Sequence, residues 1–242
     1  MEPKTFYEAT AERNSSQINY SIPKPIPFVG KWASKSRIQI AYEMLLPYAP
    51  FANLLDVGCG DLNNLITLQN MFGKGFGVDI AIYPNWELLG DKINTYQHNL
   101  DSEPLPFPNE KFDAVTILMV LEHIFDPFTV IEEIARVTKP KGYLVINVPN
   151  IAYIKHRLGL LVGRLPVTST TKCWEMREWD GGHIHYFTIE RLTWLLCKFG
   201  GYQILQVQSS GRLGPLKRVW PSLLCSDIQI LCRKQQYSNE IE

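Results

Sequence analysis

The most regular feature of the chain is an alternation of short apolar runs with stretches in which apolar residues recur every three to four positions. The runs predict β-strands, and the wider spacing predicts amphipathic helices. Because the two kinds of segment alternate, the pattern favours a mostly parallel sheet covered by helices on both faces. The expected strands are Asn53–Val57, Gly75–Asp79, Lys92–His98, Phe112–Met119, Gly142–Val148, Gln203–Gln208 and Asp227–Arg233.

The clearest expected helix is Pro127–Val137. Asp126 suits its N-cap and Pro127 suits its first position. Only residues 209–221 join the last two strands, and they lack helical periodicity, so those strands are expected to pair antiparallel. Further helices are expected at Lys31–Pro47, Leu62–Phe72 and Ile189–Phe199.

Three segments break the alternation and set the expected domain organisation. Residues 1–30 are polar and rich in proline, which predicts an N-terminal arm or strap. Residues 31–235 form one expected domain, with 236–242 as a tail. Residues 150–182 are too long for a simple connection and predict a lid over the substrate.

Charge and composition narrow the classes of partner. The 24 basic and 24 acidic residues cancel, so no bulk attraction to nucleic acid is expected. The longest uncharged apolar run, Ala114–Leu121, is too short to span a membrane, and the first residues lack the apolar core of a secretory signal, so a cytoplasmic protein is expected. Five cysteines without a C-x-x-C pair, and no His, Asp and Glu cluster at ligand spacing, predict no metal site.

The candidate chemistry lies where the first expected strand ends. Gly58 and Gly60 predict a turn that a ligand approaches closely. Asp79, nineteen residues after Gly60, ends the second strand and could accept hydrogen bonds from both hydroxyls of a ribose. Asn63 stands in the third glycine slot of the dinucleotide fingerprint, and the nearby acids would repel a pyrophosphate. A cationic nucleoside such as S-adenosylmethionine fits better.

From about Ala52 to Arg233 the sequence resembles the class I S-adenosylmethionine-dependent methyltransferases. The segment Gly182–Thr188 is similar to an H-x-x-x-F-T segment of members that methylate small molecules, in quinone, saccharide and secondary-metabolite biosynthesis. Leu62 and Lys141 stand where that family usually has glycine. The motifs are Leu54–Gly60, Asp79, Leu105–Phe107, Phe112–Val115, Val120–His123, Lys139–Leu144 and Gly182–Thr188.

The resemblance implies a Rossmann-like α/β fold with a seven-stranded sheet whose last strand is antiparallel. It also implies a cofactor site in which Asp79 holds the ribose, Leu100 stacks on the adenine, and Asp101 or Asn99 binds the adenine amino group, with Asp101 preferred. The full expected cofactor set is Asp56, Gly58, Cys59, Gly60, Asp79, Ile80, Asn99, Leu100, Asp101, Leu118 and Met119.

Methyl transfer from a sulfonium needs mainly alignment and exclusion of water, and a general base is optional. His185 is the candidate base, although it could instead hydrogen-bond the cofactor-side loop, and His123 and His183 are further catalytic candidates. His123 could instead cap a helix or serve packing. A lid aromatic clamp for the substrate is a second hypothesis, against simple packing. Its members would be Tyr153, Trp174, Trp179 and Tyr186.

The expected function is methyl transfer from S-adenosylmethionine to an oxygen, less readily a nitrogen, of a small metabolite. Basic residues outnumber acids in 13–42 and 151–178, so an anionic acceptor is a further hypothesis. The first alternative is a non-catalytic S-adenosylmethionine-binding partner or regulatory module. A nicotinamide oxidoreductase comes third, because Asn63 and the antiparallel last strand oppose it.

Overall fold

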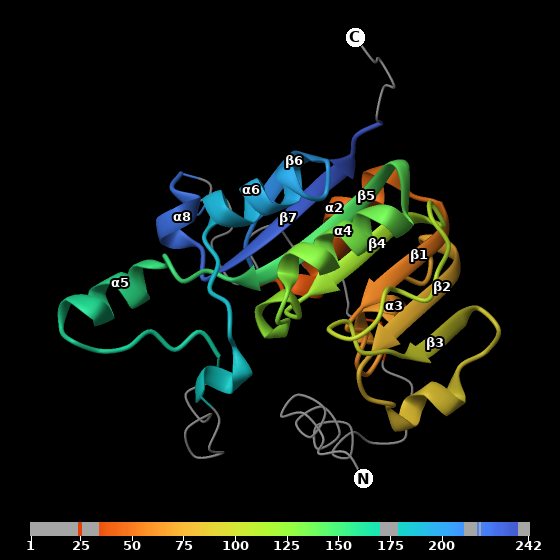
Figure 1. The fold of residues 1–242 in the computed structure, drawn as a ribbon, viewed down its shortest axis with the longest axis horizontal. Coiled ribbons are helices and arrows are strands. Elements are labelled where there is room, and N and C mark those ends of the chain that lie inside the picture. The colour runs from red at the N-terminus through yellow and green to blue at the C-terminus, as the bar shows by residue number, and fades with distance from the viewer. Residues whose placement is uncertain (1–23, 26–33, 170–178, 211–216, 218, 237–242) are drawn as a thin grey trace.

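A computed structural model describes residues 24–25, 34–169, 179–210, 217 and 219–236. Its centre is a seven-stranded sheet in the order β3-β2-β1-β4-β5-β7-β6 (Figure 1). All seven expected strands are confirmed, with ends that differ by a few residues. They are β1 (Phe51–Val57), β2 (Phe72–Asp79), β3 (Ile93–Gln97), β4 (Phe112–Leu118), β5 (Thr138–Pro149), β6 (Tyr202–Gln208) and β7 (Asp227–Lys234).

The first five strands are parallel, and β7 runs antiparallel to both of its neighbours, β5 and β6. This confirms the antiparallel last strand. Strand order reverses at β1, which has β2 on one side and β4 on the other. In open α/β sheets, ligands bind outside the carboxyl ends of the strands at such a switch point. The fold therefore directs attention to the residues that follow β1, β2 and β4.

Helices cover both faces of the sheet, as the alternation predicted. One core lies under α4 (Pro127–Val137) and α6 (Ile189–Lys198), which Figure 1 shows side by side on the same face. A second core lies under α2 (Arg37–Leu45) and α3 (Asn63–Leu68). Successive residues of β1 alternate between these cores, with Leu54 in the second and Leu55 in the first. The central strands are therefore buried on both faces.

Two helices begin later than their periodicity predicted. The expected start of the first helix, 31–33, lies outside the described residues, and α2 begins at Arg37 because Ser36 forms a capping box with Gln39. The second helix begins at Asn63, since Leu62 takes a left-handed φ of 68°. It ends at Leu68, four residues earlier than expected, because the chain already enters β2 at Phe72. By contrast, α4 has the expected bounds, with Asp126 accepting from the amides of Phe128 and Thr129.

The start of β5 also differs from the prediction. The strand begins at Thr138, which pairs with Phe112, and then shifts register before Tyr143 pairs with Ala114. Residues 139–141, expected to precede the strand, thus form an irregularity inside a longer strand. Lys141 has a left-handed φ of 63° at this point. The bulge absorbs the residues that the pattern predicted as a connection.

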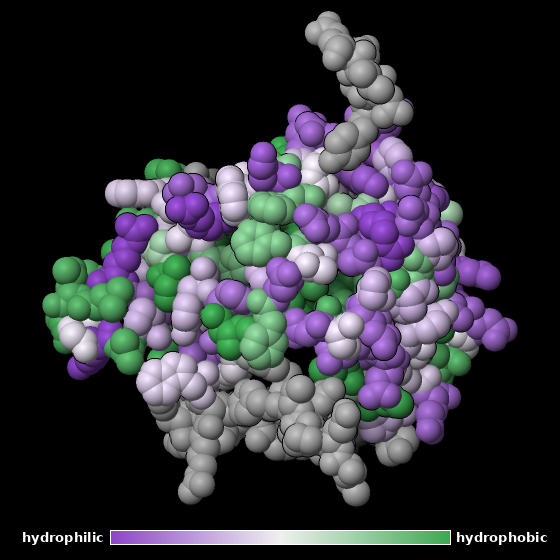
Figure 2. Space-filling model, viewed as in Figure 1, coloured by the Kyte–Doolittle hydropathy of each residue, from purple (hydrophilic) through white to green (hydrophobic). Residues whose placement is uncertain are grey.

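The expected lid contains a helix that stands away from the sheet. Figure 1 shows α5 (Ile154–Leu161) projecting from one end of the molecule. All eight residues of α5 are described, and none is buried. Figure 2 shows hydrophobic side chains gathered at this end, where Leu158, Leu161 and Val162 are exposed. Among the described residues, no helix is long and apolar enough to cross a membrane.

Candidate active site

The glycine turn after β1 is held tightly between two neighbouring strands. The amides of Gly58 and Cys59 both donate to the carbonyl of Val78, at 2.8 and 3.0 Å. Gly58 has a φ of 71°, and a Cβ placed on it would lie 2.1 Å from Cγ2 of Val120. Glycine is therefore required at this position both for backbone conformation and for space. The contact also brings the segment after β4 against the turn.

Three carboxylates surround this turn. Asp79 accepts from the amide of Gly60 at 2.9 Å and from the amide of Ala81 at 3.1 Å, which orients its carboxylate at the end of β2. Burial raises the pKa of Asp79. Burial also raises the pKa of Asp56 to about 7, opposed by bonds from Thr116 and Asn64 and reinforced by the charges of Asp79 and Asp61. A bound cation would relieve this concentration of negative charge.

Asp56 lies at the bottom of the turn and is 2% exposed. Its Oδ1 accepts from the hydroxyl of Thr116 at 2.6 Å and from Nδ2 of Asn64 at 2.8 Å. These bonds connect β1, β4 and the first turn of α3 beneath the glycines. The side chain of Cys59 points away from the turn and toward Gly77 of β2. A Cβ placed on Gly77 would lie only 2.6 Å from its Sγ. Its side chain therefore packs between β1 and β2.

A short segment after β2 covers the turn, and sequence reasoning missed it. In η2 (Pro84–Leu88), the indole Nε1 of Trp86 donates to the carbonyl of Gly60 at 2.9 Å. Buried Asn85 donates to the carbonyl of Asp61 at 2.6 Å. Tyr83 stacks with Trp86, and its hydroxyl would lie 3.7 Å from a Cβ on Gly60. The aromatic residues on either side of Pro84 were the only signal of this role in the sequence.

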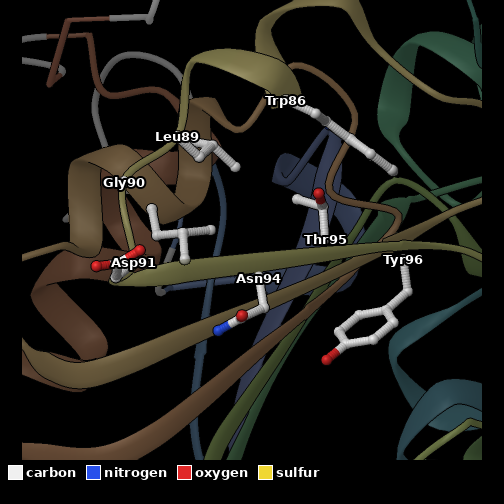
Figure 3. A pocket seen from close by; sticks show the side chains of 8 residues that line it. Trp86, Leu89, Gly90, Asp91, Asn94, Thr95 and Tyr96 are labelled. Atoms are coloured by element: carbon white, nitrogen blue, oxygen red, sulfur yellow. The ribbon is translucent and has the colours of Figure 1, made fainter.

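A surface pocket lies behind this cover, beside β3. Figure 3 shows Trp86 and Leu89 on one side of it and Asn94, Thr95 and Tyr96 of β3 on the other. The pocket flanks the edge strand, whereas the turn and Asp79 lie at the carboxyl ends of β1 and β2. The carboxyl ends remain the better candidate site, because they combine the strand-order reversal with the buried carboxylates. Trp86 contributes to both regions.

The residues expected around the adenine follow β3. Asn99 and Leu100 are half-buried, and Leu100 packs at the margin of the core under α4. Oδ1 of Asp101 accepts from the amide of Phe125 at 2.8 Å, and Oδ1 of Asn99 accepts from the amide of Asp101. Half-buried Ile80 follows Asp79 directly. The expected adenine-binding side chains therefore reach the same end of the sheet as the turn.

The end of β4 carries an unusual backbone conformation. Met119 has a φ of 60° and donates its amide to the carbonyl of Asn147 at 2.8 Å. A non-glycine residue in this region stores strain, which is frequent at functional sites. Leu118 and Met119 are half-buried and lie next to Val120, the residue in contact with Gly58. The carboxyl end of β4 is therefore adjacent to the glycine turn.

Two of the three candidate histidines meet beside this strand end, together with Glu122. The rings of His123 and His183 lie edge to face with centroids 4.8 Å apart. Nε2 of His183 is 3.9 Å from Oε1 of Glu122. Burial raises the pKa of Glu122 to about 8, and burial with the charge of His123 lowers that of His183 to about 4. The segment around His183 is held here because the amides of residues 184 and 185 donate to the carbonyl of Glu122.

His185 lies apart from this pair. Its Nε2 contacts the carbonyl of Phe125 at 3.2 Å, before the first turn of α4. Of the expected aromatic clamp, Trp179 and Tyr186 are exposed and Tyr153 packs edge-on against His156. Trp174 lies outside the described residues. The structure thus brings together His123 and His183, with Glu122 as a partner that sequence reasoning did not single out.

Comparison with known proteins agrees with this geometry. A family model described as a methyltransferase domain matches residues 17–207. An uncharacterised methyltransferase of Schizosaccharomyces pombe is 35% identical over 106 residues, which cover 38% of this chain and 37% of that protein. A demethylmenaquinone methyltransferase of Geobacillus stearothermophilus is 37% identical over 101 residues, which cover 38% and 42%.

A solved structure extends the likeness to most of the fold. An S-adenosylmethionine-dependent methyltransferase from Mesorhizobium loti has a TM-score of 0.61 at 16% identity, covering 82% of this chain and 98% of that one. The chain thus matches only about two fifths of the two curated relatives. The likeness in three dimensions covers most of the chain and is a likeness of fold.

Proposed function

The chain belongs to this family of methyltransferase domains, and from that premise we propose that it transfers a methyl group from S-adenosylmethionine to an oxygen of a small metabolite. The product of the donor would be S-adenosylhomocysteine. The observation that carries the proposal is the gathering of Asp56, Asp61 and Asp79 around a glycine turn at the strand-order reversal of the sheet. A pyrophosphate would be repelled here, whereas a cationic cofactor is attracted.

The donor matches this turn group by group. The sulfonium and the ammonium of S-adenosylmethionine are the two cations that the carboxylates favour. Asp79, oriented by the amides of Gly60 and Ala81, presents its carboxylate for the ribose hydroxyls. Gly58 and Gly60 leave the backbone open to close approach. Trp86 and Tyr83 would close the cofactor side against water.

The acceptor side is proposed to lie at the end of β4. Val120 packs against Gly58, so the pair His123 and His183 lies close to the place where the sulfonium would sit. A hydroxyl or an amine must lose a proton during transfer, and polar groups at this position can receive or orient it. The likeness of Gly182–Thr188 to members that methylate small molecules is what favours an oxygen acceptor.

The projecting segment supports an anionic acceptor. Lys155, Arg157 and Arg164 lie in or next to α5, and residues 151–169 contain no acid. If these cations draw the acceptor toward the site, its apparent KM should rise with ionic strength. A KM that is indifferent to salt would count against an anionic acceptor without affecting the cofactor site.

Calorimetry with three ligands tests the cofactor. S-adenosylmethionine and S-adenosylhomocysteine are expected to bind, and NAD is expected not to bind. The Asp79→Asn variant should lose most of the affinity for both because its carboxylate accepts hydrogen bonds that an amide cannot all accept. Binding of NAD alone would favour the oxidoreductase alternative and overturn the proposal.

The transferred atom is tested with donor labelled at the methyl carbon. A small-metabolite extract is incubated with the full chain and labelled donor, and the product is examined by mass spectrometry and carbon NMR. The shift of the labelled carbon distinguishes methyl on oxygen from methyl on nitrogen. Donor binding without incorporation would favour the non-catalytic binding module.

A further inference from the structure

The carboxylate of Glu122 is buried, and its two oxygens lack a hydrogen-bond donor among the described residues. The residue is 0% exposed, and neither of its side-chain oxygens accepts a hydrogen bond within the described part of the chain. Burying an ionised carboxylate without a donor or a counter-charge is very costly. A proton or a bound cation must therefore accompany this side chain.

The side chain that faces Glu122 is His183, and its hydrogen bonds show that Nε2 presents a lone pair. Thr168 donates its hydroxyl to Oδ2 of Asp180 at 2.7 Å, since a carboxylate only accepts. The same hydroxyl oxygen is 2.7 Å from Nδ1 of His183, so Nδ1 must be the donor in that contact. The ring of His183 then carries its proton on Nδ1 and presents the lone pair of Nε2 toward Oε1 of Glu122, 3.9 Å away.

This chain of bonds has the form found behind histidines that bind metals. Such a histidine usually donates its second ring nitrogen to a neighbouring polar group, which fixes the tautomer and the orientation of the ring. Thr168 and Asp180 do this for His183, and the amides of residues 168 and 169 hold Asp180 in place. For His123, Nδ1 lies 3.2 Å from the carbonyl of Gly182.

The three side chains are spaced as a metal site requires. One ligand atom from each of Glu122, His123 and His183 lies within 4.8 Å of the other two. Two bonds of about 2.1 Å to one ion span about 3.4 Å at a tetrahedral angle and up to about 4.2 Å when collinear, so the 3.9 Å between Glu122 and His183 is close to the spacing that an ion needs.

We propose that Glu122, His123 and His183 bind a divalent transition-metal ion beside the methyl-transfer site. Two imidazoles and one carboxylate are typical ligands of ions such as Zn²⁺, Fe²⁺ and Co²⁺, and they leave coordination positions open. Three protein ligands with open positions characterise catalytic sites rather than structural ones.

The position of the site gives the ion a role, which rests on the proposed methyl transfer. Val120, two residues before Glu122, contacts Gly58 of the cofactor turn. An acceptor hydroxyl bound to the ion would lose its proton to water more readily. A lone pair of the acceptor oxygen then forms the O–CH₃ bond. The bond between the methyl carbon and sulfur breaks, and the electron pair of that bond returns to sulfur to give neutral S-adenosylhomocysteine.

Titration with Co²⁺ tests the site directly. The full chain, freed of metal with a chelator, is titrated while visible absorption and heat are recorded, without any donor present. One equivalent per chain is expected to bind and give ligand-field absorption. Glu122→Gln and His183→Gln should each weaken binding by at least about tenfold. The matched control is His156→Gln, because His156 lies on α5 and outside the cluster.

Three outcomes would overturn the proposal: no binding of Co²⁺, equal binding by the Glu122→Gln and His183→Gln variants, or loss of binding in His156→Gln. The first outcome would mean that a proton alone accompanies Glu122. Calorimetry of donor binding by each variant shows that it is folded. Donor binding that fails while Co²⁺ binds would overturn the proposed function and leave the metal site standing.

The role of the ion needs a separate measurement. Transfer of labelled methyl into a small-metabolite extract should fall at least about tenfold in the metal-free chain and return on addition of Co²⁺, Zn²⁺ or Mn²⁺. Equal transfer with and without metal would overturn the acceptor-binding role.

Discussion

Two residues with a left-handed backbone conformation stand at motif positions where glycine was expected. Leu62 and Lys141 stand where glycine is usual, and both adopt a positive φ, of 68° and 63°, that glycine adopts freely. The backbone therefore has the conformation that glycine favours, and the side chains of Leu62 and Lys141 make it strained. Leu62 compensates by complete burial in the core under α2 and α3, whereas Lys141 is exposed. Of these two residues, only Lys141 has backbone strain without an evident gain in packing.

Replacing Lys141 with glycine is accordingly expected to stabilise the protein. Relief of the left-handed conformation should exceed the added entropy of the unfolded chain, for a net gain of about 0.5–1 kcal/mol. Chemical denaturation measures the change in the free energy of unfolding. Lys141→Ala is the control, because alanine keeps the strain and should bring no gain. Equal effects of the two substitutions would show that backbone strain at this position is negligible.

The charge of Asp56 should make cofactor binding depend on pH. Its pKa is raised to about 7 by burial, with Asp79 and Asp61 adding to the shift, and a bound cation would lower it. Affinity for S-adenosylmethionine should therefore rise roughly tenfold between about pH 5.5 and 7, as Asp56 ionises. Calorimetry in buffers of different ionisation heat would also detect release of its proton. Asp56→Asn should bind more weakly and with a flat profile over this range.

The same shift affects stability in the absence of cofactor. Because the folded protein holds this proton more tightly than the unfolded chain does, the contribution of Asp56 to stability is complete below about pH 4. It is lost as pH rises toward 7. Affinity for the cofactor and stability of the free protein should thus change in opposite directions over this interval.

Among the elements, α5 stands out because it contributes little to the core. Leu161 is 80% exposed and Leu158 is 54% exposed, although both are large and apolar. Replacing Leu161 with serine should therefore change the free energy of unfolding by no more than about 0.5 kcal/mol. Leu192→Ser is the matched control, since Leu192 lies in the core under α6 and its loss should cost about 3 kcal/mol or more. A large effect of Leu161→Ser would show that α5 packs against the rest of the chain.

Elements differ in how well the sequence predicted them, for physical reasons. The bounds of α4 were predicted because its cap, its proline and its apolar face are all local signals. By contrast, α3 was predicted too long, because a left-handed Leu62 and an early β2 are set by packing. The cover of the turn by Trp86 was missed, since a bond from its indole to Gly60 joins residues 26 positions apart.

At the scale of the whole molecule, cofactor binding should be visible as stabilisation. A ligand that binds only the folded state at a hundred times its Kd adds about 2.7 kcal/mol, or about 5–10 °C in Tm for a chain of this size. Thermal denaturation with increasing S-adenosylmethionine measures the shift. Asp79→Ala should show little shift at the same concentrations, although its own fold is intact. An equal shift in this variant would exclude Asp79 from the binding site.

Of the candidate site, only the arrangement of the glycine turn and Asp79 could be predicted from the sequence. The glycine turn and Asp79 lie within a short stretch of sequence, so their spacing was informative. Glu122 and His183 are separated by 61 positions, and the sequence contains nothing that joins them. They meet because the backbone after His183 bonds to the carbonyl of Glu122. The proposed metal-ligand set is assembled in this way, so it is visible only once the chain is folded.

The place of β7 in the sheet has a consequence for synthesis on the ribosome. β7 is the last of the described strands along the chain, yet it lies between β5 and β6 and is the strand that pairs with β6. Until Lys234 has left the exit tunnel, β5 keeps an open hydrogen-bonding edge and β6 has no place in the sheet. Unpaired strand edges promote aggregation. A nascent chain paused before β7 is therefore expected to depend on chaperones, whereas a chain that includes β7 closes that edge itself.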